Sequence, residues 1–62
     1  MKIKINAKNS NETKICFSVD SVFDFVLRIT NDIELAMDVQ GWSDLAEIGE
    51  VYDTDYFVAV CE

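Results

Sequence analysis

The chain has 62 residues, half of them apolar, and a formal charge of −7 with no histidine and no proline. Its length allows one domain, spanning residues 1–62, and its two cysteines match no spacing of a disulfide scaffold, a zinc site or a redox motif. The negative charge disfavours direct binding of nucleic acid. No signal peptide and no membrane-spanning run of apolar residues is visible, so we expect a cytoplasmic protein that contacts no membrane.

The first part of the chain has the pattern of a β-hairpin. Polar and apolar side chains alternate in residues 1–6 and again in residues 13–19, with turn-forming polar residues between them. The residues expected on the buried face of the second strand are Ile15, Phe17 and Val19. The lysines expected on the opposite, exposed face of the two strands are Lys2, Lys4 and Lys14.

The middle of the chain predicts a helix from about Ser21 to Val39, because apolar residues recur there at intervals of three and four. Gly41 is the expected helix terminator. The stretch around Asn31 has weak helix formers and allows a break in the helix. Residues 33–39 also fit the strict alternation of a strand, although several of them are strong helix formers, so a strand stays open as an alternative.

A short second helix is predicted to begin at Ser43, whose side chain can cap it, with Asp44 in the first turn. The apolar face predicted for this helix comprises Trp42, Leu45, Ile48 and Tyr52. Its outer face carries Asp44, Glu47 and Glu50. Residues 53–55 are predicted to form a turn and residues 56–61 a final strand with two apolar faces, which is typical of a central strand or of a sheet covered by another molecule.

The predicted order is strand, strand, helix, helix, strand. This order favours an α+β domain, a small antiparallel sheet with both helices packed on one face. If residues 33–39 form a strand, the sheet gains a fourth member and the helices become crossover connections.

No catalytic or metal-binding motif is present. The only candidate nucleophile is Cys16, with Lys14 on the same strand face, and no histidine is available for acid–base work. The run Asp53-Thr54-Asp55 starts like a calcium-binding loop but lacks its later glycine and glutamate. We therefore predict that the protein is not an enzyme and holds neither cofactor nor metal.

Charge divides the chain into two halves. Residues 29–62 carry nine acidic side chains and no basic one, and the predicted helical side of the domain is therefore acidic. Carboxylates on a small rigid surface can imitate the phosphates of a nucleic acid, so the expected partner is a protein with a basic surface. The residues predicted to contact that partner are Trp42, Asp44, Glu47, Glu50, Tyr52, Asp53 and Asp55.

Residues 41–57 contain the run Gly41-Trp42-x-x-Leu45-Ala46-x-x-Gly49-Glu50-x-Tyr52, followed by Tyr56-Phe57. This run resembles the C-terminal part of small uncharacterised proteins encoded by phages and integrative elements of low-GC Gram-positive bacteria. The resemblance implies an accessory protein of a mobile genetic element that acts by binding. With its acidic, nucleic-acid-like face, such a protein is expected to act as an inhibitor of a basic protein. The alternative is a structural domain that forms a homo-oligomer such as a homodimer, because so short a chain cannot cover all of its apolar surface.

Overall fold

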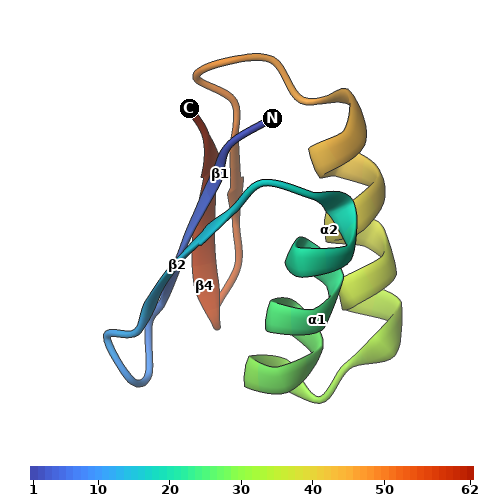
Figure 1. Ribbon diagram of the computed structural model, residues 1–62. Helices are drawn as coiled ribbons and strands as arrows, with labels where there is room; N and C mark the ends of the chain where they lie inside the picture. Colours follow the sequence, from blue (N-terminus) through green and yellow to red (C-terminus); the bar gives the residue numbers. More distant parts are fainter.

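The computed structural model describes all 62 residues. Its elements are β1 Ile3–Ala7, β2 Thr13–Cys16, α1 Val19–Thr30, α2 Ile33–Leu45, β3 Val51–Asp53 and β4 Phe57–Cys61. The strands form one antiparallel sheet in the order β2-β1-β4-β3, and both helices cover the same face of it (Figure 1). The predicted α+β class, a small antiparallel sheet with helices packed on one face, is confirmed.

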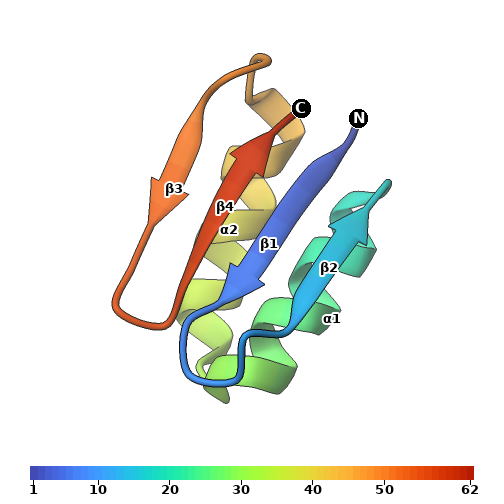
Figure 2. The same ribbon diagram turned by 90° about the vertical axis from the view of Figure 1, so that its left-hand side faces the viewer.

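The two central strands, β1 and β4, supply the sheet's contribution to the core. Along each strand, buried and half-buried residues alternate, and the buried ones face each other across the pair, as Ile3 faces Cys61 and Ile5 faces Ala59. The half-buried ones lie on the other face, which neither helix covers (Figure 2). The two-sided apolar pattern of the final strand therefore fits its central position.

Strand β2 is paired in the opposite phase to the one predicted. Cys16 lies opposite Ile3 and is fully buried, whereas Ile15 lies opposite Lys4 on the uncovered face. Phe17, expected in the core, is 69% exposed, and Lys14 is on the helix-covered face opposite the buried Ile5. Alternation alone specifies a strand but not which face is buried, and pairing with β1 decided it.

The predicted helix over residues 21–39 is interrupted near Asn31, as its weak helix formers allowed. Helix α1 begins at Val19 after its N-cap Ser18, whose hydroxyl accepts a hydrogen bond from the Ser21 N–H at 3.1 Å. At its end Asn31 adopts the left-handed conformation with φ 54°, and its N–H donates to the Leu27 carbonyl. These contacts satisfy backbone groups at both ends of the helix.

Helix α2 covers residues 33–39, so the strand alternative for them is wrong. Asp32 caps it by accepting a hydrogen bond from the Leu35 N–H at 3.1 Å. The helix then continues through Gly41 to Leu45. Gly41 is therefore not a terminator, and Ser43 is not an N-cap: it is buried inside the helix, and its hydroxyl donates to the Gln40 carbonyl. Burial of Val39 and Ser43 on either side carries the helix across a glycine that costs about 1 kcal/mol relative to alanine.

The predicted second helix is also wrong beyond Leu45. The chain leaves the helix at Ala46, turns at Gly49 with φ 97°, and forms β3, which pairs with β4. The fourth strand of the sheet is thus Val51–Asp53. Leu45 and Ile48, expected on a buried helix face, are 82% and 83% exposed. A hairpin between β3 and β4 satisfies backbone groups that a short helix would leave unpaired at its ends.

The core lies between the sheet and the two helices. It comprises eleven buried residues, Ile3, Ile5, Cys16, Val22, Phe25, Val26, Ala36, Val39, Phe57, Ala59 and Cys61. Neither helix is both long and apolar enough to cross a membrane.

Candidate functional site

The two aromatic residues predicted to contact a partner face the core. Trp42 of α2 is half-buried, and its ring lies edge-on to Tyr52 of β3, with centroids 5.6 Å apart. Tyr52 in turn stacks on the buried Phe57 of β4 at 6.2 Å. Burial, together with the negative charge of Asp38, raises the pKa of the Tyr52 phenol above its ordinary value. These rings hold the end of α2 against the sheet.

Three of the predicted acidic residues gather where α2 ends and the loop to β3 begins. Asp44, Glu47 and Glu50 are all exposed. The Glu50 carboxylate accepts a hydrogen bond from the Glu47 N–H at 3.1 Å, which closes the loop. Asp44 lies in the last turn of α2, not in a first turn as predicted. Its charge therefore meets the negative end of the helix dipole, with no basic residue in that turn to offset it.

The other two predicted acids, Asp53 and Asp55, lie at the opposite end of β3 from that loop (Figure 2). Asp53 forms an ion pair with Lys8 of the β1–β2 hairpin at 2.7 Å, and Asp55 is exposed. The predicted contact residues thus divide into an inner aromatic pair and two separate acidic groups. No three acidic or cysteine side chains converge closely enough to hold a metal ion.

The structure reveals a surface that sequence reasoning missed, which we call the α2 ridge. It consists of Ile33, Met37, Gly41 and Leu45, four residues apart and therefore in one row along the outside of the helix. The apolar members are 57%, 59% and 82% exposed. The signal is present in the sequence, since α2 has apolar residues on two sides.

A hollow of about 320 Å³, the α2 groove, runs beside the ridge and faces the start of α1. Its lining residues are Val19, Met37, Gln40, Gly41 and Asp44. A Cβ atom placed on Gly41 would meet nothing within 4 Å, and its φ is not positive. Neither packing nor backbone conformation within this chain therefore requires a glycine at that position.

Acidic residues border the ridge. Glu34 and Asp38 lie along one flank, Asp44 lies on the other, and all three are exposed. Only three of the twelve acidic side chains form ion pairs, as Lys2–Glu62, Lys8–Asp53 and Arg28–Glu12, and none of these belongs to α2. The outside of α2 therefore combines exposed apolar side chains with uncompensated negative charge.

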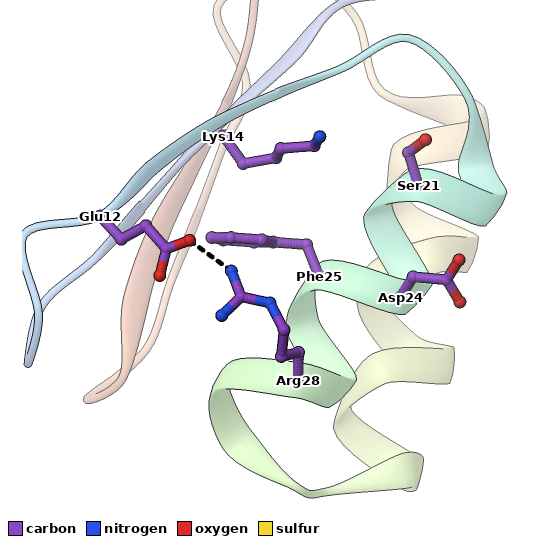
Figure 3. A pocket seen from close by; sticks show the side chains of 6 residues that line it. All are labelled: Glu12, Lys14, Ser21, Asp24, Phe25 and Arg28. Atoms are coloured by element: carbon purple, nitrogen blue, oxygen red, sulfur yellow. Dashed lines mark hydrogen bonds and ion pairs between the residues drawn. The ribbon is translucent and has the colours of Figure 1, made fainter.

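A second hollow of about 330 Å³ lies between β2 and α1 (Figure 3). Its lining residues are Glu12, Lys14, Ser21, Asp24, Phe25 and Arg28. The Arg28 guanidinium pairs with Glu12 and lies 5.1 Å from the centre of the Phe25 ring. Charges of both signs line this hollow, so it has no strong electrostatic preference of its own.

The Cys16 thiol, the only candidate nucleophile, is fully buried in the core. Burial raises its pKa, and the positive charge of Lys14 opposes this effect without overcoming it. A raised pKa keeps the thiol protonated at neutral pH, which is the less reactive form. Ile3 of β1 lies between Cys16 and Cys61, and both cysteines are free.

Comparison of the chain with protein-family models, with curated proteins and with solved structures gives no match.

Proposed function

We propose that this is a small acidic accessory protein that works by binding a basic surface on another protein, through the outside of α2 and the loop that follows it. The observation that carries the proposal is the α2 ridge, where exposed apolar side chains stand among carboxylates that form no ion pair. Exposed apolar residues that lie together typically mark an interaction site, and unpaired carboxylates favour a cationic partner.

The outside of α2 has both apolar and acidic side chains, and this combination indicates which kind of partner surface it can bind. A surface that only imitated nucleic acid would need carboxylates alone, whereas Ile33, Met37 and Leu45 add apolar contact area. The partner therefore offers both apolar and positively charged groups, as the nucleic-acid-binding surfaces of proteins do when aromatic side chains accompany lysine and arginine. The resemblance of residues 41–57 to phage and integrative-element proteins supports an accessory protein that acts by binding, and by occupying such a surface it would act as an inhibitor.

The proposal is tested by affinity capture from an extract of the source organism, followed by binding measurements on the captured protein. Charge reversal at Asp44→Lys with Glu47→Lys is expected to weaken binding at least about tenfold. The matched control is Glu12→Lys with Asp24→Lys, which changes the net charge equally, on exposed positions next to β2 and on α1, and should bind nearly as well as the wild type.

Salt dependence provides the second measurement. Affinity should fall steeply between about 50 and 500 mM salt, because exposed charges are screened over a few ångströms at the higher concentration. Equal binding by both double variants, or an affinity that salt does not change, would overturn the proposed function.

A structural role through self-association is the second candidate, and the uncovered face of the sheet favours it. Ile15, Val58 and Val60 are half-buried on that face, and Val51, opposite Val60, is 55% exposed. Light scattering on a size-exclusion peak at high micromolar concentration decides the matter. A dimer that Val60→Lys dissociates supports this role, and a monomer rules it out.

A further inference from the structure

The shape of the α2 ridge is that of a helix surface prepared to pack against another helix. Residues spaced four apart form the rows that fit into the grooves of a second helix in the commonest packing class. Ile33, Met37, Gly41 and Leu45 form one such row over the length of α2. No element of this chain packs on it, since the apolar members are more than half exposed.

Gly41 interrupts the row with a position that has no side chain. Because a Cβ there would meet nothing within 4 Å, the gap is open to solvent, and it joins the α2 groove next to Met37. A glycine inside an exposed helix lowers helix propensity, and the structure shows no compensating contact within the chain. Close approach of another backbone is the established use of a glycine in this situation.

The negative charges on the two sides of the α2 ridge indicate the charge of the helix that would pack there. Glu34 and Asp38 on one flank and Asp44 on the other have no cation within ion-pair distance. An apolar row between two acidic flanks is complementary to a helix whose apolar stripe lies between lysine or arginine residues. An extended strand would find no backbone groups to pair with on α2, because those groups bond within the helix.

We infer that the α2 ridge binds a cationic amphipathic helix of the partner protein, which crosses α2 at Gly41 and places one of its side chains in the α2 groove. This inference rests on the proposed function, because it gives the shape and chemistry of the basic surface. Met37 and Val19 contact the inserted side chain, and Asp44 pairs with a flanking lysine or arginine.

The test uses two synthetic peptides of about 18 residues, or about five helical turns, with identical leucine and lysine content. In the first, leucines recur at intervals of three and four to form one stripe. In the second, the same residues are permuted so that no stripe exists. Each peptide is titrated into the ¹⁵N-labelled full chain, and amide shifts give both the affinity and the location of binding.

The decisive variant is Gly41→Gln, which fills the gap without changing charge and replaces glycine with a better helix former. Ser10→Gln, at an exposed position of the β1–β2 turn, adds the same side chain elsewhere. We expect the striped peptide to bind at least about tenfold more tightly than the permuted one and to shift α2 amides around Gly41. Gly41→Gln should reduce this affinity at least about tenfold, while Ser10→Gln leaves it unchanged.

The outcomes separate this inference from the proposed function. If both peptides bind equally, or if Gly41→Gln binds as the wild type does, the helix inference is overturned while binding of basic partners stands. If neither peptide binds even at about 20 mM salt, both are overturned. Circular dichroism of Gly41→Gln confirms that the fold is kept, so loss of binding is not loss of structure.

Discussion

Trp42 lies edge-on against Tyr52 and joins the last turns of α2 to the edge strand β3, with the planes of their rings at 62°. Tyr52 is nearly parallel to Phe57 of β4, at 13°. The three rings therefore run from the helix layer into the sheet. They support the loop over residues 46–50, which carries the exposed Ile48, Glu47 and Glu50.

The aromatic pair is expected to show a favourable coupling energy. Trp42→Leu and Tyr52→Leu should each lower the free energy of unfolding by about 1–2 kcal/mol, since each removes a half-buried ring but keeps apolar bulk. The double variant should lose about 0.5–1.5 kcal/mol less than the sum, which is the usual value of an aromatic pair. Urea unfolding followed by circular dichroism measures all four proteins. Strict additivity would contradict the contact.

The two glycines of the chain should respond oppositely to alanine. Gly41→Ala should raise the free energy of unfolding by about 0.5–1 kcal/mol, because the helix gains propensity and the added Cβ meets nothing. Gly49→Ala should lower it by about 1 kcal/mol or more, because alanine rarely adopts a φ of 97°. Thermal or urea unfolding of both variants checks the signs. A destabilised Gly41→Ala protein would show that the position is constrained by contacts within the chain.

The two ends of α2 should differ in their response to loss of an acid. Asp32→Ala removes the N-cap of α2, which accepts a hydrogen bond from the Leu35 N–H, and should lower the free energy of unfolding by about 1 kcal/mol. Asp32→Ser keeps a capping oxygen and should recover most of this loss. Asp44→Asn removes a charge from the negative end of the helix dipole and should stabilise by about 0.3–1 kcal/mol at low salt. Added salt should shrink the Asp44 effect, and a stabilisation that about 0.5 M salt leaves intact would exclude the dipole explanation.

Alkaline pH should destabilise the protein partly through Tyr52. Burial and the charge of Asp38 raise the pKa of this phenol in the folded chain above its usual value of about 10. The unfolded chain therefore releases this proton first. The raised pKa of Tyr52 therefore adds to the free energy of unfolding in full below pH about 10, and this addition is lost as the pH rises through the folded-state pKa.

The control for this effect is Tyr52→Phe, which keeps the ring and cannot ionise. Its free energy of unfolding should decrease less steeply than that of the wild type above pH about 10, measured by urea unfolding at each pH. Cys16, whose pKa burial also raises, contributes equally in both chains and cancels in the comparison. If the free energy of unfolding depends on pH in the same way for the wild type and Tyr52→Phe, Tyr52 has the same pKa in the folded and unfolded chains.

Sequence patterns were informative where one local preference dominated. The alternation in residues 1–6 indicated β1. The two apolar faces of residues 56–61 indicated either a central strand or a sheet covered by another molecule, and β4 is central. The weak helix formers at Asn31 indicated where the long apolar repeat breaks. Each of these features depends on neighbours within a few residues, so each can be inferred without the rest of the fold.

The spacing of apolar residues gave a wrong prediction where the same intervals occur in a helix and in a helix followed by a loop and a strand. The series Trp42, Leu45, Ile48 and Tyr52 fits one helix face, yet the structure packs its half-buried first and last members against the core and exposes the other two. The chain leaves the helix between them because β3 can pair with β4, whose residues lie further along the chain, as Val51 pairs with Val60. The spacing of apolar residues within one segment gives no information about the free energy that strand pairing contributes.

The sequence by itself determined the α+β class, the negative charge of residues 29–62 and the lack of a motif for catalysis, because composition and short-range periodicity establish these. Only the tertiary structure decided which face of β2 is buried, where α2 ends, and that Ile33, Met37 and Leu45 lie outside with Gly41 between them. A helix with apolar residues on two sides can bury either one. The choice depends on which side matches α1 and the sheet, and the side left over is the one that we propose for a partner.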